Sequence, residues 1–249
     1  MSGPFLLVVD FSTPGGTLHD QCVEKLEEIA RSARETEPGN SKYAILVPRE
    51  DDDDHDDKDT GGKRSNRLWV LEEYADQASI DFHTSSAPVQ AINAWFRETG
   101  FFAASSPASS DAAVPGPGPT VRRWRHLSPD FTFSRPAAGT HPDPYVVLAE
   151  LDYAPGGAAT ATPYWRAVVD AAREEEPGTL AYGVLREEGE EGEGDRLCTA
   201  EVYESEAYLR EVHVPGHAVA ANIRGTKGIR TGLGHHVLRK IGGYLYKEG

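Results

Sequence analysis

Two histidines are the side chains in this sequence best suited to acid–base chemistry. His83 and His213 each come about ten residues after a Glu-x-Tyr tripeptide, and a proline follows each of them, Pro88 and Pro215. Imidazole titrates near neutral pH and can remove a proton from a phenol or an enol. A helix break at the prolines would turn each ring towards a pocket, so both histidines are candidate catalytic bases. The alternative is a histidine that only caps or hydrogen-bonds its own loop.

The Glu-x-Tyr tripeptides supply the next candidates. Glu72 and Tyr74 are two residues apart, as are Glu201 and Tyr203, so each pair shares one face of a predicted strand. If that face lines a cavity, the carboxylates orient the histidines and the tyrosines donate hydrogen bonds to a substrate. If it is the outer face, all four residues make surface or interface contacts, and the sequence leaves both possibilities open.

Two further tyrosines, Tyr43 and Tyr182, lie on the predicted neighbouring strands. Their hydroxyl groups can stabilise an oxyanion during catalysis, although a tyrosine that only packs in the core fits the same pattern. The remaining candidates for substrate contact are aromatic and polar side chains: Trp69, Trp95, Asn93, His217 and Asn222. His213 and His217 have the i, i+4 spacing of metal ligands, but no third ligand is evident and no metal site is predicted.

Two copies of one sequence pattern position all of these residues. Each copy opens with an apolar run, continues through Pro-Gly-Gly into an amphipathic helix, and ends that helix at Glu-Pro-Gly, with a tyrosine four residues later. Two predicted strands, a second helix that carries the histidine and a last strand complete each copy. The matching segments are 5–11 and 145–151, 14–16 and 155–157, 37–39 and 176–178, 42–48 and 180–186, 67–74 and 196–203, and 121–133 and 236–246.

The order βαββαβ, found twice, predicts an α+β fold of two ferredoxin-like repeats, each an antiparallel sheet with helices on one face. We expect a first domain at residues 1–135, a linker at 136–144 and a second domain at 145–249. Within the first domain, the stretch Phe101–Thr120 is rich in Ala, Ser, Pro and Gly, and is predicted to be a flexible excursion.

The charge of the chain argues against nucleic acid as a partner. There are 25 Lys and Arg residues against 40 Asp and Glu, which gives a formal net charge of −15. Binding to a phosphate backbone needs a basic face, which this composition does not favour. Much of the acidic excess lies in two runs, 50–59 and 187–195, which we interpret as solvated loops because like charges repel one another. Neither run has the ligand spacing of a calcium-binding loop.

The apolar pattern and the cysteines indicate a cytoplasmic protein without a membrane partner. No run approaches the roughly 18 apolar residues of a membrane span. The N-terminal run Phe5–Val9 is too short for the core of a secretion signal. Cys22 and Cys198 are the only cysteines, and we interpret both as buried thiols in a reducing compartment.

Together these motifs resemble the antibiotic biosynthesis monooxygenase family, whose domain forms a dimeric α+β barrel. The likeness rests on the Pro-Gly-Gly opening, the Glu-Pro-Gly-x-x-x-Tyr turn, the Glu-x-Tyr strand end and the histidine that follows. The resemblance implies that the two repeats join their sheets into one barrel, so the chain is a monomeric pseudo-dimer or forms a homodimer. It also implies a ligand cavity in each half, between the sheet and its helices.

The resemblance further implies a cofactor-independent monooxygenase that acts on a phenolic, polyketide-like aromatic molecule with O₂. No glycine-rich dinucleotide motif follows a strand, so no cofactor is predicted. The same cavity would also suit isomerisation, cyclisation or decarboxylation without O₂, because a fold does not fix a reaction. Heme degradation, which some relatives perform, and a non-catalytic role in small-molecule binding or stress response are further alternatives. The sequence does not decide which of the two copies is active.

Overall fold

The computed structural model describes residues 3–49, 66–104, 118–188 and 193–248. The first repeat has the predicted order, with its second helix divided into three. Its elements are β1 (Phe5–Ser12), α1 (Gly16–Thr36), β2 (Asn40–Pro48), β3 (Arg67–Tyr74), α2 (Gln77–Ser85), α3 (Ala87–Thr99), α4 (Phe101–Ala104) and β4 (Thr120–His126). Gly15 and Gly16 enter α1 with φ of 79° and 54°, a conformation that explains why this turn is Pro-Gly-Gly.

The second repeat follows the same order after a short connection. The connection contains the turn η1 (Pro129–Phe131), β5 (Thr132–Ser134) and α5 (Ala137–Thr140). The repeat itself consists of β6 (Tyr145–Tyr153), α6 (Gly157–Glu174), β7 (Thr179–Glu188), β8 (Glu193–Tyr203), α7 (Glu206–Tyr208), the π-helical turn η2 (Leu209–His213), α8 (His217–Thr226) and β9 (Arg230–Tyr244).

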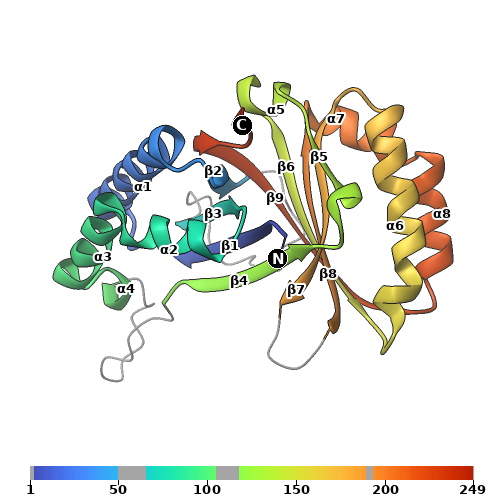
Figure 1. The fold of residues 1–249 in the computed structure, drawn as a ribbon, viewed down its shortest axis with the longest axis horizontal. Coiled ribbons are helices and arrows are strands. Elements are labelled where there is room, and N and C mark those ends of the chain that lie inside the picture. The colour runs from blue at the N-terminus through green and yellow to red at the C-terminus, as the bar shows by residue number, and fades with distance from the viewer. Residues whose placement is uncertain (1–2, 50–65, 105–117, 189–192, 249) are drawn as a thin grey trace.

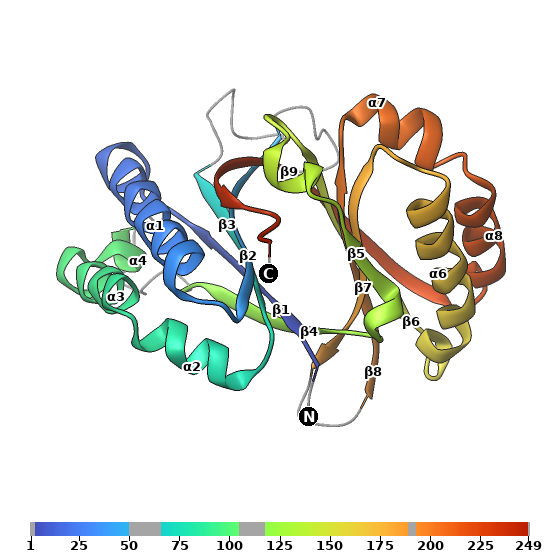
Figure 2. The ribbon, with the colours of Figure 1, turned by 45° about the horizontal axis from the view of Figure 1, so that its top comes forward.

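Eight strands close into one antiparallel barrel within the single chain (Figures 1 and 2). Each half has the strand order last–first–third–second, namely β4-β1-β3-β2 and β9-β6-β8-β7. The halves join where β2 pairs with β9 and where β4 pairs with β7, and β5 extends the pairing along β7. The predicted pair of ferredoxin-like repeats in one intramolecular barrel is therefore confirmed.

Alternation along the strands separates three apolar layers. One layer fills the barrel and draws residues from both halves, among them Leu6, Trp69, Trp124 and Leu148. The other two lie outside the barrel, one under α1 and α3 and one under α6 and α8. Figure 2 shows the helices of each half covering the outer face of its own strands.

The last strand of each half reaches across to the other half. At the end of β9, Tyr244 pairs with Tyr43 on β2, and its hydroxyl group donates a hydrogen bond to Asn40. In the opposite direction, Arg135 follows β5 and donates hydrogen bonds to the carbonyl oxygens of Glu176 and Thr179 at the end of α6. At the end of α1, Lys247, which follows β9, donates hydrogen bonds to the carbonyl oxygens of Ala33 and Glu37. The end of each first helix is therefore held by a residue from outside its own repeat.

Parts of the segments expected to be loops are ordered. Phe101, at the start of the expected excursion 101–120, lies in α4 and is fully buried, because several aromatic side chains surround it; residues 105–117 lie outside the described residues. At the end of the acidic run 187–195, Asp195 accepts hydrogen bonds from the backbone N–H groups of Gly156 and Ala158 at the start of α6. The acidic run 50–59 lies outside the described residues.

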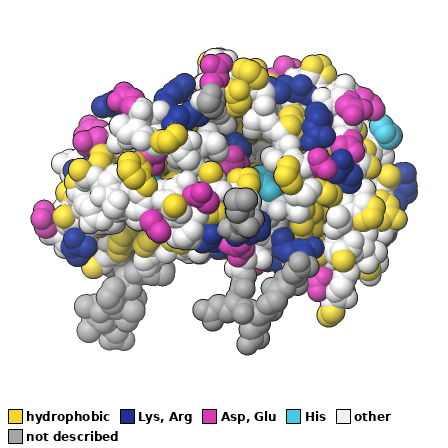
Figure 3. Space-filling view, in the orientation of Figure 1, with side chains coloured by type: hydrophobic (Ala, Val, Ile, Leu, Met, Phe, Trp, Pro, Cys, Tyr) yellow, Lys and Arg dark blue, Asp and Glu magenta, His cyan; other side chains and the backbone are white. Residues whose placement is uncertain are grey.

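The described surface carries charges of both signs. On the face shown in Figure 3, the Lys and Arg side chains are interspersed with Asp and Glu side chains. Among the described residues, none of the helices combines the length and the hydropathy needed to cross a bilayer.

Candidate active site

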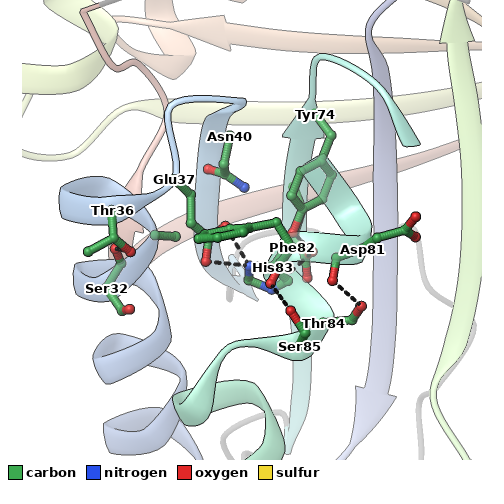
Figure 4. Close-up of polar contacts among 12 residues, drawn as sticks. Ser32, Thr36, Glu37, Asn40, Tyr74, Asp81, Phe82, His83, Thr84 and Ser85 are labelled. Carbon is green, nitrogen blue, oxygen red and sulfur yellow. Dashed lines mark hydrogen bonds and ion pairs between the residues drawn. The ribbon is translucent and has the colours of Figure 1, made fainter. Parts of the chain in front are cut away.

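In the first half, a carboxylate holds the predicted histidine. Glu37 lies at the end of α1, and His83 lies in α2 (Figure 4). The Nδ1 atom of His83 is 2.9 Å from Oε2 and 3.1 Å from Oε1 of Glu37. Only 5% of His83 and 3% of Glu37 is exposed to solvent. The imidazole therefore has one nitrogen fixed by a buried carboxylate.

The other side of this ring faces the Glu-x-Tyr tripeptide. Nε2 of His83 lies 3.9 Å from Oε2 of Glu72, which accepts a hydrogen bond of 2.6 Å from the hydroxyl group of Tyr74. The rings of Tyr74 and Tyr43 lie 5.4 and 5.7 Å from the imidazole, centre to centre. Tyr43 pairs directly with Glu72 across β2 and β3, so the sheet brings these predicted residues together on its helix-covered face.

The second half repeats the arrangement residue for residue. Nδ1 of His213 lies 2.7 Å from Oε2 of Glu176, and the hydroxyl group of Tyr203 donates a 2.7 Å hydrogen bond to Glu201. The rings of Tyr203 and Tyr182 lie 5.1 and 5.5 Å from the imidazole. The Glu-x-Tyr pairs thus lie on the helix-covered face of the sheet, outside the barrel, where they are buried beneath the helices and not at the surface of the protein.

Burial and charge act against each other on the histidines. Burial lowers the pKa of His213, but the hydrogen bond with Glu176 and the negative charges of Glu201 and Glu176 raise it more, so the pKa lies above 6.5. The pKa of His83 is raised in the same way, by Glu37 and Glu72 against burial. Both rings are therefore stronger bases than free imidazole.

The tyrosines around the histidines remain protonated. Burial, followed by the charge of Glu201, raises the pKa of Tyr182 and of Tyr203 well above the ordinary value. Burial and the charge of Glu72 have the same effect on Tyr43. Each phenol is therefore a hydrogen-bond donor at neutral pH, in the protonation state that stabilisation of an oxyanion requires.

The partners of the histidines, Glu37 and Glu176, were not among the residues predicted from the sequence. Their signal was the repeated Glu-Pro-Gly turn, which we interpreted only as a helix end. The glycines of the turn have their own structural reason. A Cβ atom on Gly39 would lie 2.1 Å from Oγ of Ser79, and one on Gly178 would lie 2.4 Å from the ring of Tyr208. Glycine thus lets the second helix of each half approach the turn that carries the glutamate.

Beyond these shared clusters the two halves differ. In the first half, aromatic side chains fill the layer between the helices and the sheet: Phe11, Trp95, Phe96, Phe101 and Phe102. The second half has a polar group in the corresponding layer, between α6, α8 and the start of β9. The halves thus differ in the chemistry they can offer a ligand.

An arginine is the centre of this polar group. Nη2 of Arg230 lies 3.1 Å from Oδ1 of Asn222 and 2.9 Å from Oγ1 of Thr226. Asn222 is 2% exposed, and its Nδ2 atom has no hydrogen-bond partner in the structure. Close by, Nε1 of Trp165 donates to the hydroxyl group of Tyr153, which also interacts with Arg230. Asn222 is among the residues predicted from the sequence, whereas Arg230 and Tyr153 are not named there as individual site residues.

Arg230 was missed because we placed the last strand at 236–246. The structure begins β9 at Arg230, since residues 230–234 pair with β6. This earlier start brings the guanidinium group under α8.

Several predicted residues do not join either cluster. Trp69 points into the barrel, on the opposite face of the sheet from His83, and packs on the ring of His236 at 4.5 Å. Asn93 is exposed on α3, and Trp95 packs against Phe96 and Phe101. His217 is largely exposed at the start of α8, whereas His213 is buried, so the two do not converge on one site. Within the described ranges, no group of three or more His, Cys, Asp or Glu side chains is placed to hold a metal ion.

The structure differs from the expected open cavities. In each half the space between sheet and helices is occupied by a buried cluster of side chains. Two of the pockets among the described residues lie elsewhere. One, of about 180 Å³, is a polar surface pocket near Arg49 and Arg210, and the other, of about 20 Å³, lies inside the barrel. Neither is lined by His83 or His213.

Comparison with known proteins gives one family match and several structures with the same fold. Residues 144–213 match the family described as antibiotic biosynthesis monooxygenase. None of the curated proteins matches the sequence significantly. A protein of Lactobacillus acidophilus NCFM, provisionally named a monooxygenase, is 10% identical with a TM-score of 0.69, over 99% of this chain and 100% of its own. A protein of Fusobacterium nucleatum subsp. nucleatum ATCC 25586, named in the same way, is 15% identical with a TM-score of 0.70, over 100% and 99%.

A third structure, of an anthrone oxidase-like protein, is 12% identical with a TM-score of 0.55, over 96% of this chain and 92% of its own. At these identities the likeness shows a common fold, which here extends over both repeats. The chain thus contains two repeats that share the fold of these proteins, and residues 144–213, in the second repeat, match the antibiotic biosynthesis monooxygenase family.

Proposed function

We propose that the chain is a cofactor-independent monooxygenase of a phenolic or anthrone-like aromatic molecule, and that the second half carries the reaction. The observation that supports this most directly is the buried Glu176–His213 pair, which supplies a base, with the ring of Tyr182 5.5 Å from the imidazole as a phenol donor. Arg230, which is half-buried, and the buried Asn222 add polar donors further along the same half, near the other end of β6. The first half has the base, but aromatic side chains occupy its corresponding layer.

In this proposal His213, in its neutral form, takes a proton from the substrate. Glu176 holds Nδ1 and stabilises the imidazolium ion that results. Tyr182, which remains a neutral donor beside the imidazole, binds the phenolate or enolate oxygen, and Arg230 with the free N–H of Asn222 binds a second oxygen at the far end of the aromatic molecule. The electron-rich anion then reacts directly with O₂.

The overall reaction balances without a cofactor. A ring methylene and O₂ give a ring carbonyl and water: two C–H bonds break, one C=O bond forms, and O₂ accepts four electrons. One oxygen atom enters the product and the other leaves as water with the two hydrogens. Removal of water from the site protects the intermediates from side reactions.

Substrate entry requires a movement, because His213 is only 4% exposed. The residue ends the π-helical turn η2, an element that is common at functional sites. Its neighbours Val212 and Val214 are 41% and 48% exposed. We propose that the turn moves outward to admit the substrate. The family description and the name of the anthrone oxidase-like structure support the choice of substrate class.

The experiment is O₂ uptake by metal- and flavin-free protein with anthrone and a panel of hydroquinones, under ¹⁸O₂. The expected result is uptake of one O₂ per product, with one ¹⁸O atom in the product. His213→Gln should remove the activity, whereas His83→Gln, which alters the equivalent residue of the first half, should retain it. Absence of uptake across the panel would contradict the proposal. Turnover without O₂ uptake and without incorporation of ¹⁸O would indicate isomerisation, cyclisation or decarboxylation instead.

Burial of both imidazoles favours a second candidate, a binding protein without catalysis. In that case the Glu–His pairs only stabilise the turn between the first helix and the second strand of each repeat. Hydrogen exchange of residues 209–216 with and without an anthrone distinguishes the candidates when combined with the uptake assay. Protection by the ligand without O₂ consumption would support binding alone.

A further inference from the structure

A small pocket lies inside the barrel, directly behind the cluster of the second half. Its walls include Leu6 and Val146 from the first strands of the two repeats, and Ala181, Gly183 and Ala200 from β7 and β8. It also touches Tyr182 and Glu201, whose side chains lie on the other face of the same strands. One sheet therefore separates this pocket from His213.

Small residues in one repeat create the pocket. In the first half, the positions equivalent to Ala181, Gly183 and Ala200 hold larger side chains: Lys42, Ala44 and Leu71. The equivalence follows from the register, because Tyr43 pairs with Glu72 and Tyr182 pairs with Glu201. The barrel interior is thus asymmetric: its free space lies against the small residues of the second half, and Lys42 and Leu71 of the first half form part of the opposite wall.

The volume and the lining of the pocket determine whether it binds water or a small apolar molecule. The volume is about 20 Å³, and nearly all of the exposed lining is apolar. Room of about 10–15 Å³ suffices for one water-sized molecule, but a bound water needs two to four polar partners, and apolar cavities stay dry and take up xenon. Among the polar side chains at the rim, Glu73 binds both Lys42 and His126, and the Nδ1 atom of His126 is a buried polar atom without a partner, which is fewer than the two to four partners that a bound water needs. The pocket therefore suits a small apolar molecule better than water.

We propose that this pocket binds dioxygen and holds it next to the second-half site. The proposal rests on the proposed function for the identity of the gas, because O₂ is the small apolar molecule that the reaction consumes. The binding itself is a property of the pocket and can be measured without turnover.

The direct test uses the paramagnetism of O₂. Methyl NMR spectra of the protein are recorded under nitrogen and under several atmospheres of O₂, and the relaxation of the pocket methyl groups of Leu6, Val146 and Leu245 is compared with that of Leu26 under α1. The expected result is an enhancement several-fold larger at the pocket methyl groups. Equal enhancement at all buried methyl groups would overturn the proposal.

A matched pair of variants tests whether the relaxation enhancement arises in this pocket. Ala200→Val fills the pocket, whereas Ala44→Val adds the same atoms to the barrel interior at a residue that does not line it. Ala200→Val should abolish the enhancement, and Ala44→Val should keep it. Crystals under xenon should show an atom in the pocket of the parent protein and none in Ala200→Val. An ordered water there instead would overturn the proposal.

The KM for O₂ tests whether the pocket supplies O₂ to the reaction. If the chain consumes O₂, Ala200→Val should raise the KM for O₂ several-fold with the KM for the aromatic substrate unchanged. An unchanged KM for O₂ would overturn the role in supply. If no substrate is oxidised, the proposed function fails, while the relaxation and xenon measurements still decide whether the pocket binds the gas.

Discussion

The carboxylate of Glu176 lies 2.7 Å from Nδ1 of His213, and Glu37 makes the same contact with His83 one repeat earlier. In both halves the glutamate comes from the turn after the first helix, and the histidine comes from the helical segment after the third strand. The chain thus contains two versions of one buried ion pair in different surroundings. This duplication gives each substitution in one half a natural control in the other.

Glu176→Gln should shift the pH dependence of the reaction. The glutamate raises the pKa of His213, so its neutralisation lowers that pKa and lets the histidine act as a base at lower pH. The acidic limb of the kcat/KM profile should move to lower pH, and the maximal rate should fall because the imidazolium ion loses its partner. Glu37→Gln is the control and should leave the profile in place. Equal shifts in both variants would mean that both halves are active.

The same pairs predict how stability depends on pH. The folded pKa of His213 is above 6.5 and that of Glu176 is below 4.5, so the ion pair contributes most between these values. A histidine with a raised pKa stabilises the fold below its unfolded pKa, and this contribution is lost as the pH rises through the folded pKa. Urea unfolding should therefore show Glu176→Gln less stable than the parent by about 1–3 kcal/mol near pH 6, with a smaller difference near pH 9. A difference that grows with pH would contradict this assignment.

Gly39→Ala should destabilise the first half. The added methyl group would meet Oγ of Ser79 at 2.1 Å and its Cβ at 2.8 Å, so α2 must move away from the turn that carries Glu37. Overpacking of this kind destabilises by about 1–3 kcal/mol. The double variant Gly39→Ala, Ser79→Gly removes both contacting atoms and should recover much of the loss in thermal unfolding. No recovery would show that the glycine is needed for another reason.

Tyr244→Phe should weaken the contact between the halves. Burial keeps this hydroxyl group protonated by raising its pKa, and the group donates to Asn40 in the other repeat. Loss of the donor leaves a buried amide oxygen without a partner and should lower the free energy of unfolding by about 1–2 kcal/mol. Tyr164→Phe, at a tyrosine that is 36% exposed, is the control and should change stability by less than about 0.5 kcal/mol. Equal effects of the two substitutions would contradict the role of the interrepeat bond.

The repeated motifs predicted the fold because each of them is a local signal with a physical cause. Pro-Gly-Gly marks a turn with positive φ, and apolar periodicity marks the buried faces of α1 and α6. The same signals brought Tyr43, Glu72 and Tyr74 to one face, because strand alternation fixes the side on which a residue lies, and they placed His83 in a helix that covers this face.

What the sequence left out depends on long-range packing. The role of Glu37 was invisible because the residue ends one helix and meets His83 only when a second helix docks, 46 residues later. Arg230 was missed because pairing with β6 extends β9 into a glycine-rich stretch that has no strand signal of its own. Trp69 was assigned to substrate contact although its register places it inside the barrel.

The reciprocal crossing of the last strands has a consequence for synthesis of the chain. The partner of Asn40 is Tyr244, 204 positions later, so a ribosome releases the first repeat long before the segment that seals its open edge exists. During that interval the outer hydrogen-bonding groups of β2 are available to other nascent chains, which is the usual route to aggregation. Removal of residues from the end of β9 would therefore destabilise the first repeat, whose strand β2 would lose its partner, as much as the second repeat.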